Sequence, residues 1–325
     1  MKAVFACVAE NREDWFERVH ALVLSIRRFG GSLAEAPIRT CFVEGADDRL
    51  SGPLRDLGAE VNVVPRVHPS YPYANKLRML ELPSSDEVLI ALDCDVVVLG
   101  DISAYPDPAA VLAKPADCDF LTREQWGRVF RELRLDPPEN GVITTTFGRR
   151  SPPYFNSGVV LVPGPMAAGL RDAWEAHVYA LQPLYDRDPG LARHRFYTDQ
   201  IALTCALVAE RATVRTLPVS MNFPTHLNVH PSFLDEAFPP LVVHYHKRID
   251  AQGWLLPTRY PEANRAIDEL NRARAEALSL PYAGMPAFTI VDGIKQGLRS
   301  KPWFHAPPVK SLRRAARRLV PASGR

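Results

Sequence analysis

The sequence predicts an α/β protein with a mostly parallel, doubly wound sheet and helices on both faces. In the first half of the chain, short apolar runs of strand length alternate with segments of helical periodicity. The runs contain few polar residues, as expected of strands that are buried on both faces. A hydrophobic content of 46% with 23% charged residues also suits a large core and excludes a disordered or collagen-like chain.

The elements can be predicted in chain order. Residues 2–9 form an apolar run that predicts a first buried strand, and the helical periodicity that follows ends at Gly30 and Gly31. Further strands are expected at 38–43, 60–64, 87–92, 119–122, 154–163, 214–219 and 241–243. Further helices are expected at 50–57, 76–82, 166–181, 199–210 and 262–278. Residues 123–153, rich in charges and prolines, are interpreted as an insertion near an acceptor site, and the chain after Pro281 as a wrapping tail.

Charge is distributed unevenly along the chain. The net charge is +2, but residues 295–325 contain nine Lys/Arg and no Asp/Glu, so residues 1–294 are acidic. No apolar run approaches the ~20 residues that cross a bilayer. The first run meets Glu10 too early for a signal peptide. We therefore expect a cytoplasmic protein.

The cysteines point to no disulfide framework and no structural zinc site. They are odd in number, widely spread and never spaced as Cys-x-x-Cys. They are predicted to be buried free thiols: Cys7, Cys41, Cys94, Cys118 and Cys205.

An Asp-x-Asp pair follows the strand at 87–92. In an extended backbone Asp93 and Asp95 would point the same way, with Cys94 on the opposite side. Such a pair suits a hard divalent cation, which would in turn hold a diphosphate. Two other copies are interpreted as structural, because one precedes a weak strand and the other lies in a Pro-flanked loop. They are Asp117/Asp119 and Asp186/Asp188.

Further motifs follow this pair in a fixed order. They are Phe155-Asn156-Ser157-Gly158, Thr198-Asp199-Gln200, Leu217-Pro218 with Asn222, and Val243-His244. Taken together, over residues 1 to about 250, the chain resembles the GT-A glycosyltransferases of family 8, the glycogenin-like and lipopolysaccharide galactosyltransferase-like enzymes. The resemblance implies the GT-A (nucleotide-diphospho-sugar transferase) fold. It also implies a retaining, metal-dependent hexosyltransferase that uses a nucleotide-sugar donor, expected to be a UDP-sugar, with Mn²⁺ or Mg²⁺. The acceptor would be a hydroxyl group of a sugar or glycolipid, in cell-surface glycan synthesis.

The resemblance also suggests roles for individual residues. It implies Asp93, Asp95 and His244 as metal ligands, with His246 as the alternative histidine. Asp199 would contact the donor sugar and Gln200 would lie where the nucleophile approaches. Donor contacts are expected from Lys76, Asn156, Ser157 and Asn222, and Val8 is placed under the base by fold analogy alone.

The chain departs from the family where a diphosphate-binding Gly-x-x-Lys-Pro-Trp would follow the histidine. Lys247 is the first candidate to replace its cation; Arg248 and the later Lys301-Pro302-Trp303 remain alternatives. A structural interpretation of these residues also stays open. Asp199 could be the N-cap of a helix, and Lys76 could be a solvated charge on a helix. Asn156 and Ser157 could form an ordinary entry into a strand.

Two other functions compete with glycosyl transfer. A sugar nucleotidyltransferase would need a Gly-rich loop after the first strand, where Glu10-Asn11-Arg12-Glu13 stands instead. A non-catalytic nucleotide-sugar-binding protein recruited to membranes is favoured by the missing Gly-x-x-Lys-Pro-Trp.

The basic tail predicts a partner of its own. Residues 309–320 combine apolar positions at helical spacing with four arginines, which predicts either peripheral binding to an anionic membrane surface or a solvated end. No nucleic acid is expected, since no platform of stacking aromatic residues is evident. We expect one GT-A catalytic domain at 1–283, with a nucleotide-binding half (1–122) and a half that binds the acceptor and completes the metal site (123–283), followed by the tail, 284–325.

Overall fold

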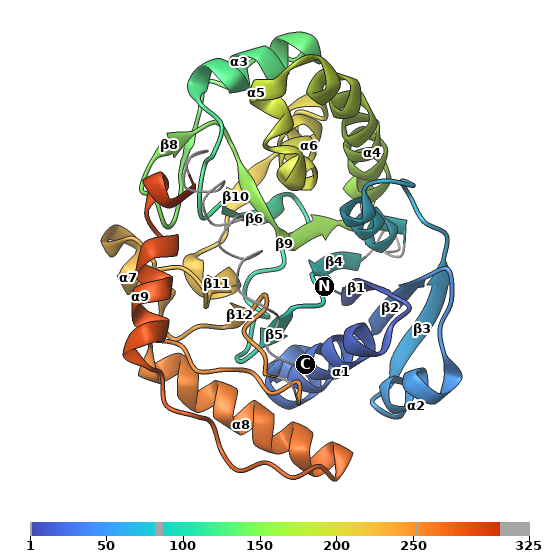
Figure 1. The fold of residues 1–325 in the computed structure, drawn as a ribbon. Coiled ribbons are helices and arrows are strands. Elements are labelled where there is room, and N and C mark those ends of the chain that lie inside the picture. Colours follow the sequence, from blue (N-terminus) through green and yellow to red (C-terminus); the bar gives the residue numbers. More distant parts are fainter. Residues whose placement is uncertain (1, 82–86, 251, 306–325) are drawn as a thin grey trace.

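The computed structural model describes residues 2–81, 87–250 and 252–305. Within them a seven-stranded sheet has the order β10-β6-β9-β4-β1-β2-β3 (Figure 1). The predicted membrane-binding segment 309–320 lies outside the described residues. The strands of this sheet are β1 (Lys2–Glu10), β2 (Ile38–Val43), β3 (Ala59–Val64), β4 (Glu87–Leu92), β6 (Val111–Pro115), β9 (Phe155–Pro163) and β10 (Val214–Thr216).

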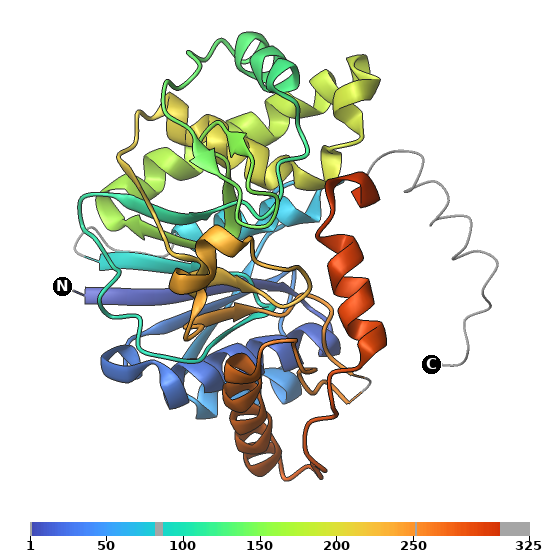
Figure 2. The ribbon, with the colours of Figure 1, turned by 90° about the vertical axis from the view of Figure 1, so that its left-hand side faces the viewer.

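Helices cover both faces of this sheet, as predicted (Figures 1 and 2). One face carries α4 (Gly164–Arg187), α6 (Thr198–Ala209) and the 3₁₀ segment η2 (Pro72–Glu81); the other carries α1 (Glu13–Phe29) and α2 (Asp48–Asp56). Successive strand residues point to opposite faces, so β4 sends Leu89 and Ala91 into the first core and Ile90 into the second. Both faces are therefore apolar, and the polar residues collect at the strand ends.

One strand runs against the others, and this decides where the site lies. β9 is antiparallel to both β4 and β6, with Leu92 opposite Val159. The beginning of β9 therefore meets the end of β4, and the Asp93 N–H donates to the Gly158 carbonyl over 2.8 Å. The Asn-Ser-Gly segment is thereby brought to the edge at which Asp93 leaves the sheet.

A smaller sheet completes this edge. It has the order β11-β12-β5, from β11 (Phe223–Pro224), β12 (Val242–His244) and β5 (Val96–Val98). β12 is antiparallel to β5, with His244 opposite Val96, and α8 (Pro261–Leu278) packs behind it in a third core. This pairing carries the late histidine back to the Asp-x-Asp segment across more than 140 residues of sequence.

Three predicted elements differ from the structure. Residues 72–81 form a 3₁₀ segment rather than an α-helix, and no strand forms at 119–122. There, Asp119 accepts from the Leu121 N–H and Thr122 caps the next helix, so both are used in a turn. The edge strand β10 ends at Thr216, two residues before Pro218, which cannot donate to a ladder.

The strand β6 was not predicted, because Lys114 interrupts its short apolar run. That lysine is fully buried and paired with Asp117. The remaining elements are η1 (Gly31–Leu33), α3 (Arg123–Glu132), β7 (Val142–Ile143), β8 (Arg150–Ser151), α5 (Pro189–Ala192), η3 (Arg195–Tyr197), η4 (Val219–Asn222), η5 (Pro231–Phe233), α7 (Leu234–Ala237), α9 (Ile290–Arg299) and η6 (Pro302–His305).

The end of the described chain wraps along the molecule (Figure 2). Gln296 of α9 donates to the Leu227 carbonyl over 2.8 Å, and the Asn228 N–H donates to Ser300. No helix in the described part of the chain is long and apolar enough to span a bilayer. The five cysteines are free and buried, which confirms that prediction.

Candidate active site

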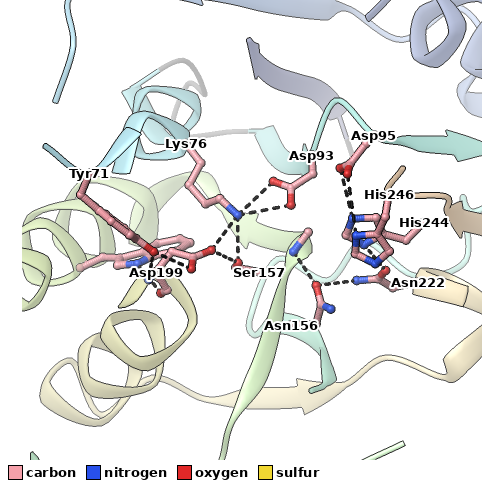
Figure 3. A network of polar contacts seen from close by, with 12 residues as sticks. Tyr71, Lys76, Asp93, Asp95, Asn156, Ser157, Asp199, Asn222, His244 and His246 are labelled. Carbon is pink, nitrogen blue, oxygen red and sulfur yellow. Dashed lines mark hydrogen bonds and ion pairs between the residues drawn. The ribbon is translucent and has the colours of Figure 1, made fainter. Parts of the chain in front are cut away.

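Two clusters of polar side chains lie at the carboxyl edge of the sheet, and Asp93 stands between them (Figure 3). The Lys76 cluster consists of Tyr71, Lys76, Asp93, Ser157 and Asp199. The Asp95 cluster consists of Asp95, Asn222, His244 and His246.

The centre of the Lys76 cluster is a buried ammonium group. Lys76 Nζ lies 3.0 Å from Asp93 Oδ1, 3.0 Å from Asp199 Oδ2 and 2.9 Å from Ser157 Oγ. Burial alone lowers the pKa of Lys76, but the two carboxylates outweigh it and the net shift is upward. The lysine is therefore charged, and it is no solvated helix residue, since only 6% of it is exposed.

Asp199 is held from several directions. Ser157 donates to its Oδ2 over 2.6 Å and Tyr71 to its Oδ1 over 3.0 Å, while Trp174 donates to its backbone carbonyl. Burial tends to raise the pKa of Asp199, but Lys76 and the hydroxyl groups of Ser157 and Tyr71 lower it overall. Its side chain is thus engaged in the cluster, and the residue before α6, Tyr197, is the N-cap position.

The Asp95 cluster gathers three metal-ligating side chains. One ligand atom each from Asp95, His244 and His246 lies within 4.8 Å of the others. His244 Nε2 is 3.1 Å from Asp95 Oδ1, and His246 Nδ1 is 3.8 Å from Asp95 Oδ2. Burial lowers the pKa of His244, but Asp95 outweighs it and the net shift is upward.

The expected extended backbone between the two aspartates is wrong. Residues 94 and 95 form a turn in which the Val96 N–H donates to the Asp93 carbonyl over 3.2 Å. The two carboxylates consequently face different neighbours: Asp93 faces Lys76, and Asp95 faces the histidines (Figure 3). Cys94, between them, is buried in the sheet core as expected.

A chain of hydrogen bonds fixes the orientation of His244. The Gly158 backbone N–H can only donate, and it donates to Asn156 Oδ1 over 2.8 Å. Asn222 Nδ2 donates to the same oxygen over 3.1 Å, which leaves Asn222 Oδ1 to accept from His244 Nδ1. His244 therefore carries a proton on Nδ1 and directs Nε2 at Asp95, the arrangement in which a second partner orients a metal-ligating histidine.

The second Asp-x-Asp copy supports this chain of bonds. Asp117 accepts from Asn156 Nδ2 over 3.3 Å and pairs with the buried Lys114. Asp119 instead accepts from the Trp126 indole. In the third copy Asp186 pairs with Arg195 at the surface and Asp188 caps α5. The carboxylates of both copies are engaged by other groups of the protein, and Asp117 anchors Asn156.

Within the described part of the chain, the other predicted site residues form no hydrogen bond or ion pair with either cluster. Val8 is half-buried against the core, Gln200 is half-buried on α6 beside Asp199, and Lys247 is exposed. Arg248 donates to the Pro257 carbonyl and lies 3.8 Å from Asp292, so it is turned toward α9; Lys301 is exposed.

Sequence reasoning missed Tyr71, Trp174 and the Lys114–Asp117 pair. Tyr71, Trp174 and Lys114 belong to no motif that the sequence displays, and Asp117 was interpreted as part of a structural Asp-x-Asp copy. Lys114, a lysine inside an otherwise apolar run, is the one signal that was available.

This fold, with its polar carboxyl edge, is the GT-A fold of glycosyltransferases. Two solved structures share it: an active-site mutant of LgtC (TM-score 0.50, 15% identity, 83% of this chain and 95% of that one) and the bifunctional glycosyltransferase WbbM (TM-score 0.50, 13% identity, 75% of this chain). This chain covers 46% of the WbbM chain, less than half of its length. A comparison with curated protein sequences finds no match.

A family model identifies the chain more closely. Residues 19–211 match the Rhodobacterales glycosyltransferase domain, and the chain belongs to that family. The matched range includes Lys76, Asp93, Asp95, Asn156 and Asp199 but ends before His244. The protein is a glycosyltransferase.

Proposed function

We propose that the protein transfers a hexosyl group, with retention of anomeric configuration, from a UDP-sugar to a hydroxyl group of a sugar or glycolipid acceptor. The observation that carries this proposal is the pairing of the two clusters at one sheet edge. One cluster offers ligands for a divalent cation, and the other offers a buried lysine and carboxylate beside it. We further propose that the chain is functionally close to glycosyltransferase family 8.

The divalent cation, Mn²⁺ or Mg²⁺, fits the residues present. Asp95 presents a carboxylate and His244 an oriented imidazole at the same point, and Asp93 lies at the same edge. Such a cation neutralises negative charge on a departing diphosphate.

The protein's own residues would position the donor. Lys76, charged and rigidly held, supplies a fixed positive charge at the donor's diphosphate or sugar. Asp199 is ionised and its Oδ1 and Oδ2 already accept two hydroxyl hydrogen bonds, so it suits binding of sugar hydroxyl groups. Among the described residues, the amide nitrogens of Asn156 and Asn222 each make one hydrogen bond, and we assign their second N–H to the nucleotide sugar.

Thermal denaturation tests the donor and the metal together. UDP should raise the unfolding midpoint when Mn²⁺ or Mg²⁺ is present and should not do so in excess EDTA, since Asp93 and Asp95 repel an unbridged diphosphate. Equal stabilisation with and without the metal would remove the metal from the proposal. Hydrolysis of a panel of UDP-sugars then identifies the donor sugar.

The anomeric configuration of the first product tests retention. Gln200 lies directly after Asp199 at the start of α6, at the position the family resemblance assigns to the nucleophile's approach. An NMR spectrum of early product should show the donor's anomeric configuration. The inverted anomer would remove both retention and kinship to family 8.

The alternative enzyme, a sugar nucleotidyltransferase, is less well supported. At the end of β1, Glu10 accepts from Arg66 and from Asn75. In a nucleotidyltransferase, backbone N–H groups at this position would bind phosphate. Here the position is occupied by an acidic residue that is paired with its neighbours. A nucleotide exchange assay with a sugar 1-phosphate and UTP should show no product.

We also propose that the protein binds anionic membrane surfaces. The helix α9 presents Ile290, Val291 and Ile294 with 84%, 57% and 56% of their surfaces exposed, and it leads into the basic residues of the tail. An apolar stripe with adjacent basic residues suits the interface of a charged bilayer. Binding to phosphatidylserine vesicles should weaken in Ile294→Glu and in a chain truncated after residue 301. Unchanged sedimentation of both variants would contradict this role.

A further inference from the structure

The Asp95 cluster contains one imidazole more than the sequence motifs require. His244 was expected as the metal-ligating histidine and His246 as its alternative. The structure brings both rings to the same carboxylate. We infer that His246 is a metal ligand together with Asp95 and His244, and that this two-histidine site selects Mn²⁺ and other transition-metal ions over Mg²⁺.

The distances suit a single cation. Two ligand atoms bonded to one ion at about 2.1 Å, with angles of 90–109°, lie about 3.0–3.4 Å apart. His244 Nε2 and Asp95 Oδ1 are 3.1 Å apart, within that range. His246 Nδ1 and Asp95 Oδ2 are 3.8 Å apart, which a small rotation of either side chain would correct. About a fifth of the Asp95 side chain and a third of the His246 side chain are exposed, so an ion can enter from solvent.

The backbone at His246 is shaped to bring its ring to this point. β12 ends at His244, and His246 takes a left-handed conformation with φ of 52° instead of continuing the strand. Histidine tolerates that conformation better than most side chains do. The ring then stacks on His244 at a centroid distance of 3.7 Å, where a continued strand would have carried it further away.

No hydrogen bond among the described residues competes with a metal ion for the ring of His246. Nδ1 is the nitrogen that faces Asp95, and neither Nδ1 nor Nε2 takes part in a hydrogen bond within the described part of the chain. A metal ion bonded to Nδ1 would therefore displace no hydrogen bond of the ring. The buried Nε2 is unpaired with or without the ion.

The ligand set determines which metal fits. Both oxygens of Asp93 lie within 3.3 Å of Lys76 Nζ, so this carboxylate is occupied by the protein itself. The remaining ligands are the Asp95 carboxylate and the imidazoles of His244 and His246. The motif in the sequence had predicted two carboxylates and one imidazole. Mg²⁺ prefers oxygen ligands, whereas imidazole suits transition metals. The inference deepens the proposed function, since the same ion would bridge the donor's diphosphate.

Electron paramagnetic resonance of Mn²⁺ tests the inference on the full-length protein without nucleotide. The free-ion signal measures binding, and pulsed measurements detect nitrogen nuclei bonded to the metal. The wild-type protein should show two coordinated nitrogens and bind Mn²⁺ at least tenfold more tightly than it binds Mg²⁺ in competition. Asparagine also tolerates the left-handed backbone conformation, so His246→Asn should keep the local fold. This variant should show one nitrogen bonded to Mn²⁺ and at least tenfold weaker Mn²⁺ binding.

A matched control and a spectroscopic count separate a ligand from a packing residue. His177→Asn removes an imidazole on α4 outside the cluster and should leave both readouts unchanged. One nitrogen in the wild-type protein, or an unchanged signal in His246→Asn, would overturn the inference while the proposed function stands. If the wild-type protein shows two nitrogens bonded to Mn²⁺ but no metal-dependent UDP binding, the metal site is supported and the proposed function is contradicted.

Discussion

The two clusters on either side of Asp93 differ in how they balance their charges. In the Lys76 cluster the ammonium lies between two carboxylates, and Tyr71 and Ser157 each donate a further hydrogen bond to Asp199. In the Asp95 cluster one carboxylate faces two imidazoles, one of them without a hydrogen bond among the described residues. The charges of the first cluster are balanced within the protein, whereas the second gathers ligand atoms around one point.

This difference separates stability from binding. A buried charge that has lost its partner is strongly destabilising, so changes in the Lys76 cluster should lower the stability of the fold even when neither metal nor donor is present. Ligands gathered around an ion gain their stability from that ion, so changes in the Asp95 cluster should mainly affect metal affinity. The following experiments would sharpen or break this distinction, and the largest expected effect comes first.

Lys76→Met should destabilise the protein by about 3–5 kcal/mol, because Asp93 and Asp199 would remain buried without a cation. Urea denaturation without metal measures the effect, and added Mn²⁺ should not restore the lost stability. Lys247→Met, which removes an exposed lysine, should change stability by no more than about 0.5 kcal/mol. Equal urea midpoints for Lys76→Met and the wild-type protein would show that the Lys76 cluster does not support the fold.

His244→Ala should lower Mn²⁺ affinity by about 100-fold or more, since the loss of a residue that only orients a ligand already costs 10- to 100-fold. Isothermal titration with Mn²⁺ measures this loss, and raised Mn²⁺ should partly restore donor hydrolysis. Without metal the variant should lose less stability than Lys76→Met. Unchanged Mn²⁺ affinity would remove the histidine from the metal site.

Asn222→Leu should lower Mn²⁺ affinity by about 10- to 100-fold without removing a ligand. The amide oxygen of Asn222 accepts from His244 Nδ1 and so keeps Nε2 available for a metal. The same titration measures the effect, with Asn62→Leu on β3 as a control that should bind normally. An affinity equal to that of the wild-type protein would mean that the ring needs no orienting partner.

Asp93→Asn should have the smallest effect on the metal, less than about tenfold in Mn²⁺ affinity, because Asp93 pairs with Lys76. Isothermal titration again gives the answer. If Asp93→Asn loses as much Mn²⁺ affinity as His244→Ala, Asp93 is a metal ligand, as the sequence motif predicts. Asp93 would then belong to the Asp95 cluster as well as to the Lys76 cluster.

Much of the site was evident from strand ends. Asp93 and His244 were identified because they adjoin apolar runs, Asn156 came from the motif that resembles the family, and all three lie at one edge of the sheet. The motif order placed Asp199 at the start of a helix, where it is found. Tyr71, a partner of Asp199, belongs to no motif and lies on a segment far from it in sequence. Asp117 was interpreted as structural, and its contact with Asn156 follows from the strand β6, which was not predicted.

The sequence by itself determined the layers, the polar edge and most of the residues that lie there. Hydrophobic periodicity is a local property, and it specifies which side of each element is buried. Only the tertiary structure decided which charges are partners. The turn at Cys94 directs Asp93 and Asp95 to different neighbours, and the left-handed backbone at His246 brings a second ring to Asp95. Both depend on the local backbone conformation and on contacts between residues far apart in the chain, which hydrophobic patterns do not specify.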